Sequence, residues 1–185
     1  EVAERTGRTL MVSQNYRFYP APRTAARLVA GGELGAGGNV SVAFRKWAND
    51  AAAGRAHRHY DYHHPLLFDM SIHHYDLMRM VLGQEAVEVW AKDTSPSWSR
   101  FTEEAAATLV VTFANGQTVT YSGSWVSPGE PTNWGGEWRM EFADGELAWT
   151  SRAGYEAGAS GDRVCFRRLD GTTITVPMEQ PSLLG

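Results

Sequence analysis

Three polar residues interrupt an apolar run that spans residues 66–82. Asp69 precedes His73 by four residues and Asp76 follows it by three, so on a helix all three lie along one stripe. Burying a carboxylate or an imidazole without a partner is costly, so this stripe must face partners, a ligand or a cleft. An Asp at this spacing can hydrogen-bond the imidazole, fix its tautomer and raise its basicity, which suits a general acid/base near neutral pH.

The spacing alone leaves two interpretations of the stripe open. Asp69 and His73 form either a catalytic pair or a buried ion pair that holds the helix against the sheet. Asp76 is expected to cap a backbone group or to orient another side chain, and it is also kept as a candidate for the substrate site. His74 points about 100° away from His73 on a helix, so packing or a loop contact is expected for it.

Two helices and one strand precede the second half of the chain. Residues 66–82 form the strongest predicted helix, which Gly83 ends. Another helix is expected over residues 23–29, ending at Gly31-Gly32, and a strand over residues 39–47. Residues 1–7 are typical of the last turns of a helix, and residues 9–13 of a short buried strand.

The second half of the chain has a strand pattern. Seven segments carry β-branched and aromatic residues or alternate in polarity: residues 86–93, 105–113, 118–125, 138–142, 147–150, 163–168 and 172–176. The turns Asn115-Gly116, Asp144-Gly145 and Asp170-Gly171 are typical of hairpins. The fold class is therefore α+β, with a large, mostly antiparallel open sheet and helices on one face.

Composition excludes several classes of function. The 185 residues carry a formal charge of −4 and no run of Lys and Arg, which argues against a nucleic-acid surface. No apolar run approaches the roughly 20 residues of a membrane span. The single cysteine, Cys165, allows no internal disulfide and is consistent with a cytoplasmic location.

All six histidines fall within 18 residues: His57, His59, His63, His64, His73 and His74. His-x-His and His-His pairs can chelate zinc or copper, but no HExxH motif is present and Arg58 separates the first pair. We therefore predict no metal site and expect a polar loop over a cleft mouth. In that loop His57, His59 and His64 would contact substrate hydroxyls.

The tryptophans divide into two groups. Trp90, Trp125, Trp138 and Trp149 occupy strand segments, where packing on the sheet is expected. Aromatic residues left exposed on such a face would serve a subunit interface, and we predict a homo-oligomer. Trp134 lies in a loop and is the better candidate to stack on a sugar substrate.

Three motifs occur in the order and spacing of a known family. The Asp69 to Asp76 stripe, the segment Asn15-Tyr16-Arg17-Phe18-x-Pro20 and the turn Glu33-Leu34-Gly35 resemble the glucose–fructose oxidoreductase/inositol dehydrogenase (Gfo/Idh/MocA) family. The resemblance covers about residues 1 to 150. The chain departs from the family at His63-His64-Pro65-Leu66, where a Gly-rich lead-in is usual, and at Ser71, where Gly is common.

The resemblance implies a fold and assigns cofactor binding and substrate binding to two different domains. Residues 1–14 would be the last helix and strand of a Rossmann domain that binds NAD or NADP. Residues 15–185 would be a glyceraldehyde-3-phosphate-dehydrogenase-like C-terminal domain for substrate binding and oligomerisation. His73 would act as acid/base or as ligand of a substrate hydroxyl, with Asp69 beside it. Tyr16 and Arg17 would approach the substrate from the inter-domain crossover, and Asn15 and Arg17 the cofactor.

The resemblance also indicates what this chain lacks. It contains no GxGxxG motif between a strand and a helix and no lysine in the family's Glu-Lys-Pro context, so by itself it is expected to be inactive. The predicted function of the whole protein is an NAD(P)-dependent oxidoreductase acting on a sugar, polyol or related hydroxy compound. The alternatives are a non-catalytic binding or assembly module of the same fold, which absence of that lysine upstream would favour, and a metal-dependent hydrolase built on the histidine cluster.

Overall fold

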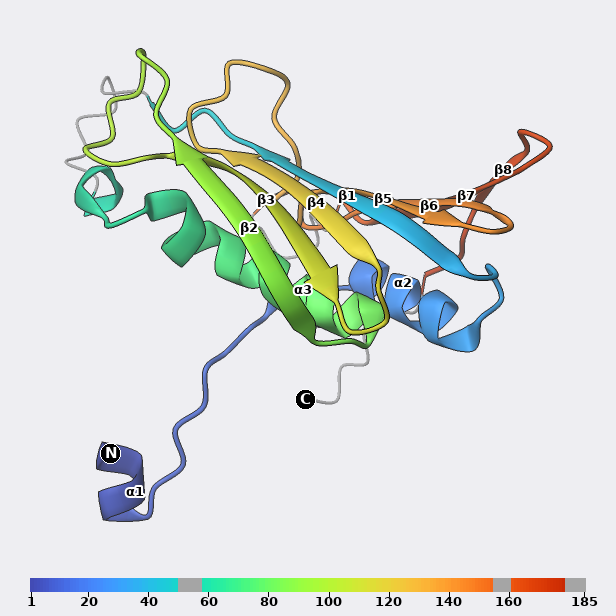
Figure 1. The fold of residues 1–185 in the computed structure, drawn as a ribbon, viewed down its shortest axis with the longest axis horizontal. Coiled ribbons are helices and arrows are strands. Elements are labelled where there is room, and N and C mark those ends of the chain that lie inside the picture. Colours follow the sequence, from blue (N-terminus) through green and yellow to red (C-terminus); the bar gives the residue numbers. More distant parts are fainter. Residues whose placement is uncertain (50–57, 155–160, 179–185) are drawn as a thin grey trace.

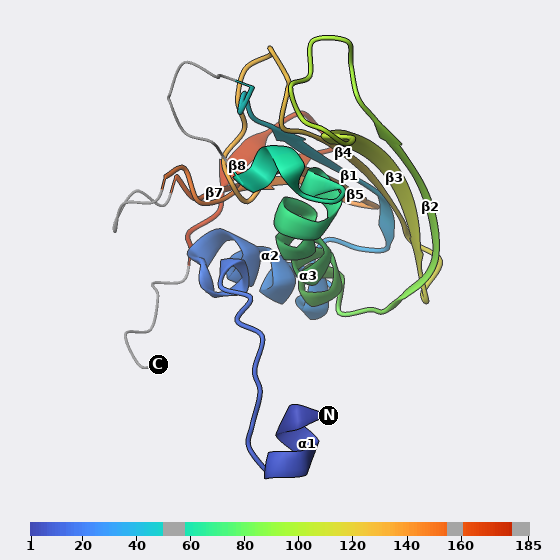
Figure 2. The same ribbon diagram turned by 90° about the vertical axis from the view of Figure 1, so that its left-hand side faces the viewer.

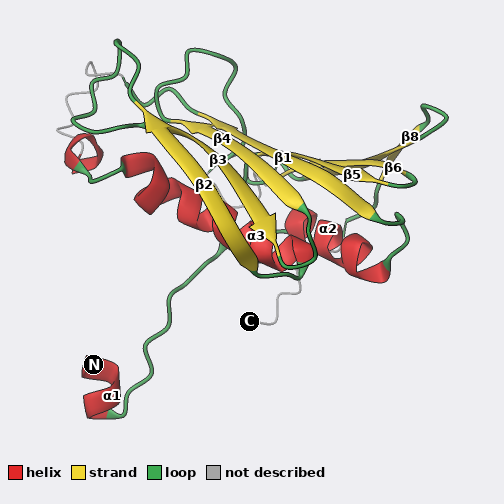
Figure 3. Cartoon of the chain, viewed as in Figure 1, coloured by secondary structure: helices red, strands yellow, loops and turns green. Residues whose placement is uncertain are grey.

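The computed structural model describes residues 1–49, 58–154 and 161–178 (Figure 1). These residues form one eight-stranded sheet, and the helices of the main body pack against one of its faces (Figures 2 and 3). The predicted fold class is confirmed. No helix in these three ranges combines the length and apolar character needed to cross a membrane.

The sheet has the strand order β2-β3-β4-β1-β5-β6-β7-β8. The seven late segments predicted as strands are strands, with ends that differ by one or two residues at most. The three predicted hairpins join β3 to β4, β5 to β6 and β7 to β8. The bounds are β1 (Gly37–Arg45), β2 (Ala86–Thr94), β3 (Ala106–Phe113), β4 (Thr118–Ser124), β5 (Glu137–Phe142), β6 (Gly145–Thr150), β7 (Arg163–Arg168) and β8 (Thr173–Thr175).

The first strand lies in the middle of the sheet. β1 pairs in parallel with β4 and antiparallel with β5, so it joins the two halves of the β-rich region. Its alternating residues Val40, Val42 and Phe44 are buried on the helix side. This insertion could not be read from the sequence, because local alternation predicts a strand but not its neighbours.

Two helical segments cover the inner face of the sheet. α2 (Pro20–Gly31) begins earlier than predicted, because proline is well suited to the first helical turn, and ends at Gly32 with φ 68°. The predicted long helix is divided into a π-helical turn, η4 (Leu66–Met70), and α3 (Ser71–Leu82). Gly83 ends α3 with φ 62°, as predicted.

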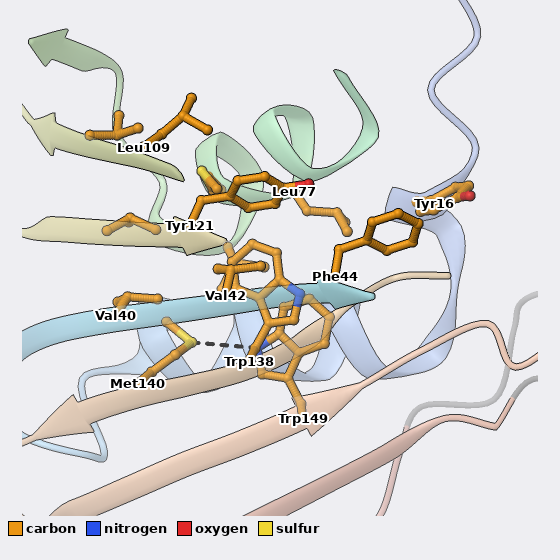
Figure 4. Close-up of a cluster of buried hydrophobic side chains, with 14 of the residues drawn as sticks. Tyr16, Val40, Val42, Phe44, Leu77, Leu109, Tyr121, Trp138, Met140 and Trp149 are labelled. Atoms are coloured by element: carbon orange, nitrogen blue, oxygen red, sulfur yellow. Dashed lines mark hydrogen bonds between the residues drawn. The ribbon is translucent and has the colours of Figure 1, made fainter. Parts of the chain in front are cut away.

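The core lies between these helices and the sheet. Leu77 of α3, Phe44 of β1 and Trp138 of β5 are almost fully buried and meet around the centre of the sheet (Figure 4). Trp138 and Trp149 stack with ring centroids 4.4 Å apart. The expected packing role of the strand tryptophans is confirmed for these two and for Trp125.

The opposite face of the sheet is open and differs from the aromatic surface that the tryptophans suggested. Trp90, on β2, is 58% exposed, whereas the other strand tryptophans point into the core. Threonine and serine dominate the centre of the open face: Ser41 on β1, Thr108 on β3, and Thr120 and Ser122 on β4. Alternating polarity along a strand predicts that the sheet has two different faces. The pairing register of the strands decides which of these faces the helices cover.

Residues 9–13, predicted as a short buried strand, form no strand within the described part of this chain. α1 (Val2–Thr6) ends at Gly7 with φ 63°, as expected, and lies apart from the body. The chain then runs extended from α1 toward the body, where η1 (Tyr16–Phe18) precedes α2 (Figure 1). Leu10, Met11 and Val12 are 80%, 79% and 76% exposed. Among the described residues this segment has no neighbouring strand, and a strand is stable only when its backbone groups are paired.

Candidate functional site

His73 lies half-buried on α3 and stacks on the ring of Tyr16. The two ring centroids are 4.2 Å apart and the planes differ by only 5°. Tyr16 is itself 4% exposed and contacts the Met70 sulfur through its hydroxyl at 4.0 Å. Tyr16 belongs to the segment that leads into this domain, and its ring therefore fixes the orientation of the His73 imidazole plane.

Gln14 controls the proton of this imidazole. Its Oε1 lies 2.7 Å from His73 Nδ1. Because an amide oxygen only accepts hydrogen bonds, Nδ1 carries the proton and the lone pair remains on Nε2. The sequence did not suggest this partner for Nδ1, which comes from 59 residues away in the chain.

Charges of both signs act on the His73 ring. Burial and the positive charge of Arg152 lower the pKa of His73, whereas the carboxylates of Asp69 and Asp76 raise it. The lowering effects dominate, so the ring is neutral at pH 7 and available as a proton acceptor. Asp69 thus influences His73 through its charge.

Arg152 was not identified from the sequence. Its guanidinium carbon lies 4.3 Å from the centroid of the Tyr16 ring. The residue has φ 61°, and its backbone N–H donates to Asp162, whose other carboxylate oxygen accepts from the N–H of Ala21 at 2.7 Å. The turn after β6 is therefore tied to the start of α2, and it brings a cation to the site.

Asp76 pairs with Arg17. The Arg17 Nε donates to Asp76 Oδ2 at 3.0 Å. This contact confirms the expectation that Asp76 orients another side chain. It also brings Arg17, predicted for both substrate and cofactor, to the same stripe of α3 as His73.

His74 is fully buried and anchors the helix that carries His73. Its Nε2 lies 3.0 Å from the carbonyl oxygen of Trp134, and its Nδ1 lies 3.1 Å from the hydroxyl of Tyr121. The carbonyl can only accept, so Nε2 donates, and Nδ1 accepts from Tyr121. The expected packing role and loop contact are both confirmed.

The π-helical turn changes the spacing on which the prediction was based. The N–H of Ser71 donates to the carbonyl of Leu66, five residues earlier. The turn therefore holds one residue more than an α-helical turn, and such turns are frequent at functional sites. A side chain at Gly123 of β4 would meet a Leu66 methyl group at 2.9 Å, so glycine lets this turn approach the sheet.

Residues 23–148 match the family model described as the GFO/IDH/MocA C-terminal domain. The chain belongs to the GFO/IDH/MocA family. It is 26% identical over 146 residues to the uncharacterized protein y4oX of Sinorhizobium fredii, covering 78% of this chain and 40% of the relative. It is also 32% identical over 116 residues to the uncharacterized oxidoreductase YrbE of Bacillus subtilis, covering 60% of this chain and 32% of the relative.

The fold is shared with solved structures of this family. An inositol dehydrogenase homolog from Azotobacter vinelandii, crystallised with NADH and myo-inositol, superimposes with a TM-score of 0.76 at 18% identity. The match covers 99% of this chain and 47% of that structure. The chain thus spans less than half the length of each of these three relatives.

The remaining predicted site residues are distributed more widely in this GFO/IDH/MocA domain. Asn15 is exposed next to Tyr16, whereas His64 lies against Asp93 and Glu103 at the other end of the π-helical turn. Trp134 packs against the core and beneath the Lys46 ammonium group, 4.7 Å from the ring centroid. His57 and the side chain of His59 lie outside the described residues. The substrate roles of these residues stay predictions.

Sequence reasoning missed Gln14, Arg152 and Asp162. Gln14 directly precedes the recognised Asn15-Tyr16-Arg17 segment, and its polarity next to an apolar run was a signal that could have been used. Arg152 and Asp162 follow β6 and precede β7, where no local pattern marks them. Only tertiary structure brings Arg152 to the Tyr16 ring and Asp162 to the start of α2.

The buried imidazole of His74 makes stability depend on pH. Burial lowers the pKa of His74 to about 4 from the ordinary 6.5, so between these values the unfolded chain binds a proton that the folded chain does not. Stability is therefore lost as pH falls from 6.5 towards 4, by up to about 1.4 kcal/mol per pH unit. Urea unfolding of His74→Gln should give a shallower pH dependence than wild type. Parallel curves would contradict this assignment.

Opposite charges near His73 should shift its pKa in opposite directions. Arg152→Met removes a nearby positive charge and should raise the pKa, whereas Asp69→Asn removes a negative charge and should lower it further. An NMR titration of the imidazole C–H signals measures both effects. Lys92→Met, on β2, is the control and should leave the His73 titration unchanged.

Proposed function

We propose that this chain is the substrate-side domain of an NAD(P)-dependent oxidoreductase that acts on a hydroxyl group of a sugar, a polyol or a related compound. The observation that carries the proposal is the His73 imidazole, held by the Tyr16 stack and by the Gln14 hydrogen bond. A neutral imidazole with a fixed tautomer is the group needed to accept a hydroxyl proton.

The chain's own residues would perform the proton-transfer half of the reaction. When bound, a nicotinamide supplies the hydride acceptor or donor. Nε2 of His73 takes the proton from the substrate hydroxyl during oxidation and returns it to the carbonyl oxygen during reduction. Arg152 keeps the imidazole neutral between turnovers, and the Asp69 carboxylate stabilises the imidazolium that forms.

The residues around His73 suit a polyhydroxylated substrate. The Arg17–Asp76 pair offers a donor and an acceptor beside His73, and Tyr16 offers a flat ring. The solved relative that contains myo-inositol and NADH provides the precedent for this substrate class. We extend the class, and not the particular compound, to the present chain.

The dinucleotide would be held mainly by residues outside this chain. No GxGxxG motif follows a strand in the sequence. The exposed side chain of Asn15 and the half-buried Arg17 lie next to Tyr16, where they can contact the nicotinamide end of a cofactor carried by another domain. We assign residues 1–14 to that domain, because the exposed Leu10, Met11 and Val12 would then pair within its sheet.

Assay of the complete protein with a polyol panel and NAD⁺ or NADP⁺ tests the proposal. His73→Ala should lower kcat by about 10²- to 10⁴-fold, the usual contribution of a general acid/base. Gln14→Ala should cause a smaller loss and alter the acidic limb of the kcat/KM profile. Unchanged melting temperature and cofactor binding would serve as controls. Unchanged turnover in His73→Ala would refute the role given to His73.

We also propose that the open face of the sheet forms a homo-oligomer interface. Short polar side chains on β1, β3 and β4 line a shallow hollow at its centre, and the ion pairs Arg139–Glu146 and Arg45–Glu137 lie towards one side at 2.7 and 2.9 Å. Such a surface can approach a copy of itself closely without burying unpaired charges.

A bulky charged residue at the centre of that face should separate the subunits. Thr120→Arg would place a long cation against its counterpart in an isologous interface. Light scattering should then report a smaller assembly than for wild type. Lys92→Gln, at the edge strand, should leave the assembly unchanged. An oligomer that tolerates Thr120→Arg would place the interface elsewhere.

A further inference from the structure

A second cluster of polar side chains lies at the far end of η4, away from the Tyr16 stack. His63 and His64 immediately precede the π-helical turn. Asp93 lies near the end of β2, and Glu103 and Glu104 lie in the connection that leads to β3. Figure 1 shows the start of the helical layer beneath this end of β2 and its long loop. The three segments meet through their imidazoles and carboxylates.

The distances within the cluster suit a shared ligand. His64 Nδ1 lies 2.7 Å from Asp93 Oδ2 and 4.0 Å from Glu104 Oε2. One ligand atom from each of the three residues lies within 4.8 Å of the others. Two ligand atoms about 2.1 Å from a tetrahedral metal ion lie about 3.4 Å apart, so the observed separations bracket the required value.

The contact between His64 and Asp93 does not have the geometry of a hydrogen bond. His64 Nδ1 is buried and has no hydrogen-bond partner in the described part of the chain, although the Asp93 oxygen is 2.7 Å away. A ring N–H donates in the plane of the ring, along the nitrogen's own direction. The Nδ1 atom is therefore left without a hydrogen bond, and the Asp93 oxygen beside it offers a second ligand atom.

A second pair of residues lies next to these three. His63 Nδ1 is 2.7 Å from Glu103 Oε2, and the His63 and His64 rings are 4.1 Å apart. Glu103 also accepts the backbone N–H of His64 at 2.9 Å, and the His63 contact lowers the pKa of Glu103. Three carboxylates therefore surround two imidazoles, and a cation would relieve their mutual repulsion.

We propose that His64, Asp93 and Glu104 bind a divalent transition-metal ion, with Zn²⁺ as the best match. Imidazole nitrogen together with carboxylate oxygen is a zinc ligand set, whereas Mg²⁺ and Ca²⁺ prefer oxygen alone. Glu103 and His63 flank the ion, and Glu103 holds the His64 backbone in place. The ion joins the loop before η4 to the end of β2 and the lead-in to β3.

The sequence alone favoured no metal site, because no HExxH motif is present and Arg58 separates the first histidine pair, and it did not place Asp93 or Glu104 near His64. The fold supplies them from segments about 30 and 40 residues away. This site is separate from His73 and independent of the oxidoreductase proposal. It would stabilise the entrance to the helix that carries His73, and its occupancy can be measured without any turnover assay.

Zinc titration of the complete, tag-free protein after removal of metals tests the proposal. Calorimetry should show one equivalent bound with a Kd in the micromolar range or tighter. Zinc at about 100 times Kd should raise the melting temperature by about 5–10 °C. Bound Co²⁺ should give the intense visible absorption of a four-coordinate site.

Matched variants separate this site from other sources of binding. Asp93→Asn and Glu104→Gln, which keep the side-chain shape, should each weaken zinc binding at least tenfold and remove most of the thermal shift. Glu88→Gln, on the same strand as Asp93, should have no effect. The double variant His57→Ala/His59→Ala should also retain binding. Retention of binding by Asp93→Asn and Glu104→Gln, its loss only in the double variant, or less than half an equivalent bound to wild type would overturn the proposal.

Discussion

The fully buried His74 side chain holds together the elements on which the site depends. Its two ring nitrogens connect α3 to the Tyr121 hydroxyl in the centre of the sheet and to the Trp134 carbonyl in the loop before β5. Ser71 lies 2.9 Å from the same hydroxyl. Because each donor has one acceptor, the protons run in a single order from Ser71 through Tyr121 to His74. A neutral imidazole is required, which is consistent with its strongly lowered pKa.

This anchor explains how neighbouring histidines can have different roles. His74 faces the sheet and is closed off from water, whereas His73 faces the entering chain and remains half-buried. The rigid packing of His74 fixes the helix, so the position of His73 is set by the core, and its proton by Gln14.

Much of the fold followed from local patterns. The hairpin turns at Asn115-Gly116 and Asp144-Gly145 and the glycine at the end of α3 are short-range signals with a direct physical cause, and each of them was predicted. The N-terminal strand over residues 9–13 was not found, because an apolar run predicts a strand only where a neighbouring strand can pair with it. The position of β1 between β4 and β5 had no local signal.

The sequence by itself determined the element types, the turns, the membership of His73 in a buried helix and the resemblance to the GFO/IDH/MocA family. Hydrophobic periodicity and turn chemistry depend on residues only a few positions apart, so both can be recognised in the amino-acid sequence. Tertiary structure alone decided the partners: Gln14 at His73 Nδ1, Arg152 above Tyr16, and Asp93 with Glu104 beside His64. These contacts join residues 29 to 136 positions apart, so they depend on the order and register of the strands and on how the helices pack on them.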